Sequence, residues 1–358
     1  MTRVATDDKA DPENERQLQP YAPSWVDRLT AWVDQLPGSS WLYYLGIGIL
    51  LFLLQTAILW GEGAYPIGTL SPSYGFIAGM LSLFPGLLHY LDNRAGAALS
   101  VLRPALEASE SEYSELHYQL TTLPARPTLL ASLASVVATG LITAFLGEPS
   151  SFRALANSPI SATFMYCLAL GVWWLFGAFI YHTIHQLRVI NRIYTAYARI
   201  NLFQMSPLYA FSSTTALTAV SLTFSIYGWY ALNPETLRDP FSLGVALLVT
   251  ALALAAFIWP LLGVHRLLAA EKVRLLDETA LHFEAAIAGL HQGLSDANLS
   301  KVDEMNKAMA SLEIEQRAIS RIPTWPWQPG TVRWLVTALV LPLVLWMIQY
   351  ALQLVLNP

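Results

Sequence analysis

The chain has 358 residues, of which 54% are hydrophobic and only 13% are charged, and its formal net charge is −5. A soluble domain averages about 25% charged residues, so this composition excludes an ordinary water-soluble globular protein. The weakly acidic charge excludes a basic nucleic-acid-binding surface, and the single cysteine, Cys167, excludes an intrachain disulfide.

The first 40 residues are polar and precede every long apolar run. Ser24 and Asp27 have the spacing of a capping box, which predicts the start of a short helix. The apolar side chains that follow share one face of that helix: Trp25, Leu29, Trp32 and Leu36. This pattern predicts a helix that lies in the membrane interface.

Seven apolar runs are long enough, or nearly so, to cross a bilayer core of about 30 Å. They are 41–60, 74–91, 128–147, 160–181, 208–232, 241–263 and 334–356, and none contains Asp, Glu, Lys or Arg. The sequence therefore predicts an all-α protein, a polytopic transmembrane helix bundle. The second run is short and contains Pro85 and Gly86, so a re-entrant hairpin is its alternative.

Lysine and arginine are distributed unevenly among the segments between these runs. With the N-terminus inside, the inner segments 1–40, 92–127, 182–207 and 264–333 hold 18 of the 20 basic residues. The outer loops hold only Arg153 and Arg238. Because inner loops are enriched in Lys and Arg, this split favours seven spans with the N-terminus inside and the C-terminus outside.

Hydroxyl side chains recur along one face of two predicted spans. The third span carries Ser132, Ser135 and Thr139, and the fifth carries Thr214, Thr218, Ser221 and Ser225. Such stripes either line a polar pathway or let helices pack closely while the hydroxyls bond their own backbone. Both interpretations remain open at this stage.

Metal and catalytic signatures are weak. His182 and His185 share a helix face, but a metal site needs three or four ligands, so we expect no metal. The sequence has no G-x-S-x-G, H-E-x-x-H or P-loop pattern. We therefore expect neither a cofactor nor an enzymatic activity.

The segment after the sixth run has a heptad pattern. Its apolar seam is Ala269, Val273, Leu276, Ala280, Phe283, Ile287 and Leu290. A second seamed helix follows after a turn at 293–298, which predicts an antiparallel helical hairpin and a coiled coil. The seam packs either within the hairpin or against another subunit or partner helix through 264–320. Val273, Leu276, Phe283, Ile287 and Leu290 are its candidate partner-binding residues.

The predicted organisation has four parts, all attached to the lipid bilayer. A cytoplasmic tail with an interfacial helix (1–40) leads into six spans with a cytoplasmic helical loop at 92–127 (41–263). A cytoplasmic helical hairpin (264–322) then precedes a Pro/Trp elbow and the last span (323–358). The abundance of Ala, Leu and Arg favours a bacterial inner membrane.

Two functions fit this sequence. The first, slightly favoured, is a passive channel or facilitator for a small solute or ion. The spans contain hydroxyl stripes, and they contain no Asp, Glu, Lys or Arg that could relay protons or ions. The alternative is a non-transporting scaffold or signalling partner that acts through the hairpin. The sequence does not identify a solute or a partner.

Overall fold

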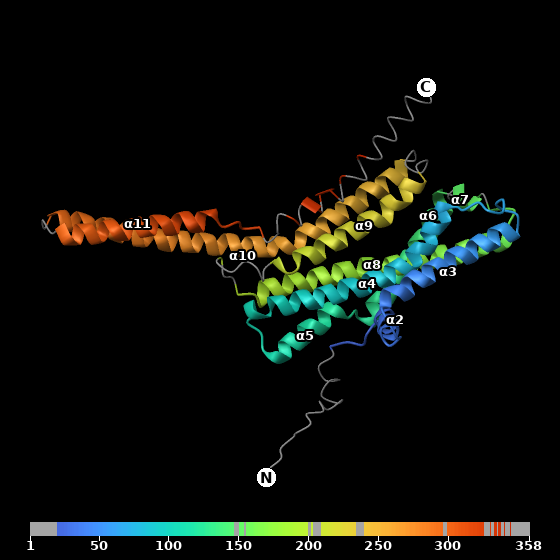
Figure 1. Ribbon diagram of the computed structural model, residues 1–358, viewed down its shortest axis with the longest axis horizontal. Helices are drawn as coiled ribbons and strands as arrows, with labels where there is room; N and C mark the ends of the chain where they lie inside the picture. The colour runs from blue at the N-terminus through green and yellow to red at the C-terminus, as the bar shows by residue number, and fades with distance from the viewer. Residues whose placement is uncertain are drawn as a thin grey trace, which may run out of the picture.

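The structure is a computed structural model. It describes residues 20–146, 150–153, 155–199, 209–233, 240–295 and 299–325, with residue 202 and seven positions between 330 and 344. In this part of the chain the regular secondary structure is helical, accompanied by two isolated β-bridges. The helices form an elongated bundle from which one helical hairpin projects (Figure 1).

The first three described helices are α2 (Trp25–Asp34), α3 (Ser40–Gly61) and α4 (Pro72–Leu102). α2 begins at the predicted capping box, in which Ser24 and Asp27 bond each other's backbone N–H. It buries Val26 and Val33 and leaves Trp32 55% exposed. Part of the face that the sequence assigns to the membrane interface is therefore uncovered.

α4 is one uninterrupted helix of 31 residues that passes through Pro85, which makes it about 46 Å long at 1.5 Å per residue. The re-entrant alternative for 74–91 is therefore wrong. The helix also continues beyond the end of the apolar run. It ends at Leu102, where the 3₁₀ turn η1 (Arg103–Ala105) contains Pro104, a residue that has no backbone N–H to extend a helix.

The chain continues through α5 (Glu110–Thr121), α6 (Ala125–Leu146), α7 (Ser150–Arg153) and α8 (Pro159–Ala196). A second capping box, between Ser109 and Glu112, starts α5. The segment predicted as an inner loop at 92–127 is therefore the end of α4, the turn η1, α5 and the start of α6.

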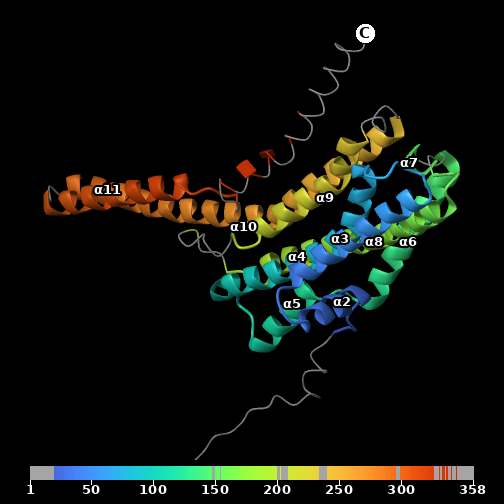
Figure 2. The same cartoon turned by 45° about the vertical axis from the view of Figure 1, so that its right-hand side comes forward.

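The last described helices are α9 (Ser212–Leu232), α10 (Pro240–Ser295) and α11 (Leu299–Arg321). α10 has 56 residues, or about 84 Å, so the predicted sixth span and the first helix of the hairpin form one helix. α11 packs along the second half of α10, and this hairpin extends away from the other helices in both views (Figures 1 and 2).

Five helical stretches among the described residues are long and apolar enough to cross a membrane: Ser40–Gly61, Pro72–Ala105, Ala125–Phe145, Pro159–Ala196 and Leu247–Ser295. α9 has the length, at 21 residues, but eight of them are Ser or Thr, which makes it less apolar. The predicted seventh span at 334–356 lies mostly outside the described residues.

Contacts between helix ends show how the chain runs back and forth. The Glu62 carboxylate, after α3, accepts hydrogen bonds from the Ile160 and Ser161 N–H groups at the start of α8, at 2.8 and 2.6 Å. At the other end, the segment after α4 pairs with the segment after α8 through Glu107 N–H and Tyr197 C=O, 2.8 Å apart. Leu102, Ile193 and Val264 share one apolar cluster there, so this is the end that carries the hairpin.

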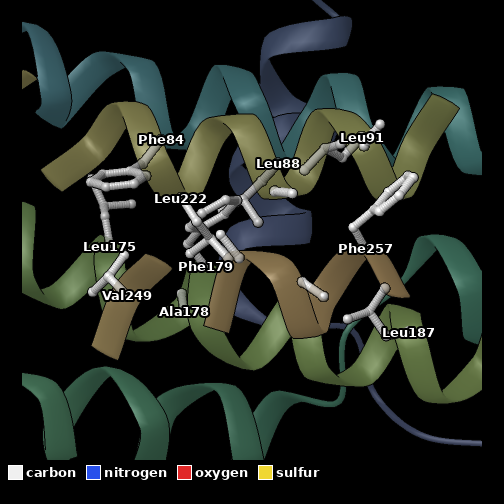
Figure 3. Packing of buried hydrophobic residues seen from close by; sticks show 14 of the residues in the cluster. Phe84, Leu88, Leu91, Leu175, Ala178, Phe179, Leu187, Leu222, Val249 and Phe257 are labelled. Carbon is white, nitrogen blue, oxygen red and sulfur yellow. The ribbon is translucent and has the colours of Figure 1, made fainter. Parts of the chain in front are cut away.

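The main core lies between α4, α8, α9 and α10. Figure 3 shows Phe84 and Leu88 of α4 packed among side chains such as Phe179 of α8, Leu222 of α9 and Phe257 of α10. These aromatic and branched side chains interlock four helices, which fixes the positions of the polar groups at the hairpin end.

Candidate functional site

Side-chain contacts join the end of α11 to α10 at the base of the hairpin. The Lys272 ammonium of α10 donates to the carbonyls of Ser320 and Ile322, at 2.6 and 2.9 Å. The His265 ring stacks on Trp325 with 4.1 Å between ring centroids. The end of α11 is therefore fixed to α10, which itself continues into the bundle as one helix.

Small residues of α10 face α11. Thr279 and Ala286 are almost fully buried, Gly293 is buried as well, and they recur at intervals of seven. At Gly289, an added Cβ would lie 3.0 Å from the sulfur of Met305. The two helices therefore approach each other closely along a row of small side chains.

The residues of the seam predicted from the sequence differ in how much of each is exposed. Leu276, Phe283 and Leu290 are half-buried beside α11, whereas Val273 is 56% exposed. Ala280 is exposed as well, and Ile287 is only half-buried. The buried positions are Thr279, Ala286 and Gly293, where small side chains permit closer packing.

A partly uncovered apolar stripe therefore runs along α10. It consists of Val273, Ala280, Ile287 and Leu294, spaced by seven, with the half-buried Leu276, Phe283 and Leu290 along one side. Leu294 is 58% exposed. We call these seven residues the heptad stripe, because their spacings of three and four residues match the seam of a two-helix coiled coil.

The hydroxyl stripe of α9 lies inside the bundle. Thr214 and Thr218 are 1% exposed and Ser221 is 9% exposed. The hydroxyls of Thr218, Ser221 and Ser225 donate to the backbone carbonyls of Thr214, Leu217 and Ser221, at 2.7 to 3.0 Å. Three of the four hydroxyls are thus bonded within their own helix.

The stripe of α6 lies where that helix crosses α8. An added Cβ on Gly177 of α8 would meet Ser132 Cα at 2.8 Å and Ser135 Cβ at 2.7 Å, and Thr139 bonds the Ser135 carbonyl at 2.9 Å. α6 packs mainly on α8, whereas α9 packs on α4 and α10. The two stripes therefore belong to different helix contacts.

A polar cavity that the sequence did not reveal lies between α2, α4 and α5. Its volume is about 500 Å³, and its lining includes Asp27, Asp34, His89, Asp92, Asn93 and His117. It is within the size range of ligand pockets. Each carboxylate in it is already bonded inside the protein: Asp34 to His89 at 3.0 Å, Asp92 to His182 at 2.7 Å, and Asp27 to Ser24 at 2.7 Å.

Asp27 connects α2 to the segment between α5 and α6. One of its carboxylate oxygens accepts hydrogen bonds from the Ser24 N–H, the Ser24 hydroxyl and the Leu123 N–H, at 2.7 to 3.1 Å. Burial raises the pKa of the Asp27 carboxyl above its usual value, although the hydrogen bonds from Ser24 and Leu123 act in the opposite direction. The group therefore helps to dock α2 on the bundle.

Asp92 and His182 form the most enclosed ionisable pair of the described residues. The His182 side chain is 1% exposed and that of Asp92 is 16% exposed, and the Gln186 amide reaches the same carboxylate oxygen at 3.5 Å. The other ring nitrogen of His182 is buried without a partner. The sequence signal was present, since Asp92 and His182 each directly follow an apolar run, but nothing in the sequence paired them.

His182 and His185 do not act together. His185 lies 2.9 Å from the Gln119 carbonyl and 3.3 Å from the Tyr21 hydroxyl, whereas His182 bonds Asp92. Among the described residues, no group of three or more His, Cys, Asp or Glu side chains is placed to hold a metal ion. The two histidines of the HxxH pattern therefore make separate contacts, His182 with α4 and His185 with α5.

The chain matches no protein-family model, no curated protein and no solved structure, so its function is argued from its own residues.

Proposed function

We propose that the protein is a scaffold or signalling partner, embedded in a bacterial inner membrane, that binds another protein through its hairpin. In this proposal the chain spans the membrane seven times with the N-terminus in the cytoplasm, as the distribution of Lys and Arg favours. The hairpin then projects into the cytoplasm, α2 lies in the interface, and the C-terminus is outside.

The heptad stripe is the observation that carries this proposal. Contiguous apolar surface in water commonly marks a site of protein interaction. On α10 the exposed Val273, Ala280 and Leu294, together with the partly exposed residues of the stripe, keep the spacing of a coiled-coil seam, although α11 packs on the neighbouring face. Since α10 continues without a break into the bundle, a partner bound to the stripe would be coupled rigidly to the membrane-embedded part.

Charged residues in the stripe should prevent complex formation. We expect Val273→Asp combined with Leu294→Asp to weaken binding by at least about tenfold, because apolar residues at the centre of an interface contribute about 1 to 2 kcal/mol each. Both side chains are more than half exposed, so the fold tolerates the change. The measurement is cross-linking in native membranes from a photoreactive residue at position 280.

The matched control is Ile314→Asp on α11, which changes an apolar residue that is 69% exposed but lies outside the stripe. It should retain the cross-linked species, identified by mass spectrometry, that the double variant loses. Equal cross-linking in the two variants, or none in the unmodified protein, would contradict the proposal.

A passive channel is the second candidate, and two buried hydroxyls favour it. Ser132 and Thr214, one on each hydroxyl stripe, are buried without a hydrogen-bond partner among the described residues, and a permeating solute would supply such partners.

If this function holds, the purified protein conducts in planar bilayers and Ser221→Leu abolishes the current. Ser213→Leu, at a half-buried position of the same helix, should leave the current unchanged. A protein that conducts no current in any form is not a channel.

A further inference from the structure

We infer that the partner of the heptad stripe is a basic amphipathic helix from another protein, with Lys or Arg beside its own apolar seam. This inference rests on the proposed function and adds the chemistry of the partner. It comes from the charges on the two sides of the stripe.

One side of the stripe is acidic and unpaired. Asp277 and Glu284 follow Val273 and Ala280 by four residues, so they occupy the flanking position of the heptad where coiled coils place interhelical salt bridges. Both are exposed, and neither takes part in an ion pair among the described residues. Arg274, the nearest cation along the helix, is held by Glu271 at 2.7 Å and Glu278 at 3.3 Å.

The other side of the stripe is closed by α11. Thr279, Ala286 and Gly293, which occupy the opposite flanking position, are buried in the contact between α10 and α11. A partner helix therefore has one charged flank available to it, and that flank is negative. Cations on the partner would complete ion pairs that the chain itself does not make.

A second copy of this chain does not meet that requirement. Two copies in one membrane run parallel, and in a parallel pair the acidic flank of one helix faces the opposite flank of the other. The one cation in that register, Lys272, is held by the Ser320 and Ile322 carbonyls, and the rest of that flank is covered by α11. Two cations in the middle of α11 are engaged as well, Lys307 with Asp303 and Arg317 with Glu313. An anionic lipid surface would be repelled by the same carboxylates.

The test uses two synthetic helical peptides of about three heptads with the same apolar seam. One carries Lys at the flanking positions and the other carries Glu. The full-length protein is held in nanodiscs of zwitterionic lipid, empty nanodiscs serve as the blank, and binding is followed by fluorescence anisotropy. We expect the Lys peptide to bind at least about tenfold more tightly than the Glu peptide, with a preference that weakens as salt rises.

Charge reversal separates this preference from non-specific attraction to an acidic protein. Asp277→Lys with Glu284→Lys should exchange the preference, so that the Glu peptide binds more tightly. The matched control, Glu304→Lys with Glu315→Lys, alters two exposed carboxylates of α11 and should keep the preference for the Lys peptide. Equal binding of the two peptides, or a preference that Asp277→Lys with Glu284→Lys leaves unchanged, overturns the inference.

The experiments distinguish a failure of the inferred basic partner from a failure of the proposed scaffold function. If the peptides bind equally while the stripe variants still lose their cross-linked partner in membranes, the scaffold function stands and the basic partner is excluded. A cross-linked species that proves to be this chain itself, with a dimer mass that Val273→Asp and Leu294→Asp abolish, identifies a second copy as the occupant and also overturns the inference.

Discussion

Replacing Asp92 with alanine is expected to lower the free energy of unfolding by about 3 kcal/mol, the range found when one member of a buried ion pair is removed. The substitution leaves both ring nitrogens of His182 without a partner, because the second is already unbonded in the folded protein. His182 is 1% exposed, so in the folded protein the Asp92 carboxylate is what satisfies this ring nitrogen. Denaturant unfolding in a mild detergent, followed by tryptophan fluorescence, measures the change.

Two further variants test the cause of that loss. Asp92→Asn keeps an acceptor for the His182 N–H and should recover a large part of the stability. Asp34→Ala removes the carboxylate of the other described Asp–His pair, but this side chain is 52% exposed, so we expect a loss of less than about 1 kcal/mol. Similar losses for Asp92→Ala and Asp34→Ala would show that enclosure is not what makes the Asp92 pair important.

Gly177→Ala is expected to separate α6 from α8 and to cost about 1 to 3 kcal/mol, the usual effect of overfilling a packed contact. The added Cβ would overlap the Ala131 carbonyl oxygen and lie 2.8 Å from Ser132 Cα. These are backbone atoms, which cannot turn aside as the end of a side chain does. The measurement is the same unfolding experiment, together with the efficiency of a cysteine cross-link between α6 and α8.

Two alanine substitutions serve as matched controls for Gly177→Ala. Gly171→Ala, on the same helix, would meet the Leu81 side chain at 2.6 Å, and that side chain can rotate. Gly140→Ala, on α6, has nothing within 4 Å and should gain up to about 1 kcal/mol, since alanine favours a helix more than glycine does. If all three variants had the same stability, close backbone packing would not be what joins α6 to α8.

Local sequence signals predicted the helices well, because they act within one or two turns. The capping box of Ser24 and Asp27 starts α2 as expected, and the apolar runs within the described residues are long helices. The ends of those apolar runs predicted the ends of the helices less well. The run at 74–91 ends before Asp92, yet the Ala-rich segment that follows contains nothing that stops a helix, so α4 continues to Leu102, close to Pro104.

The sequence by itself determined the helical class and the length of the apolar segments, because the cost of an unbonded backbone in lipid leaves few alternatives. It also provided the heptad spacing on α10. Only the tertiary structure decided which face of that heptad α11 covers, since close approach depends on the small side chains of Thr279, Ala286 and Gly293 rather than on apolarity. The same holds for Asp92 and His182: they are 90 residues apart in the chain, and only the packing of α4 against α8 brings them into one buried pair.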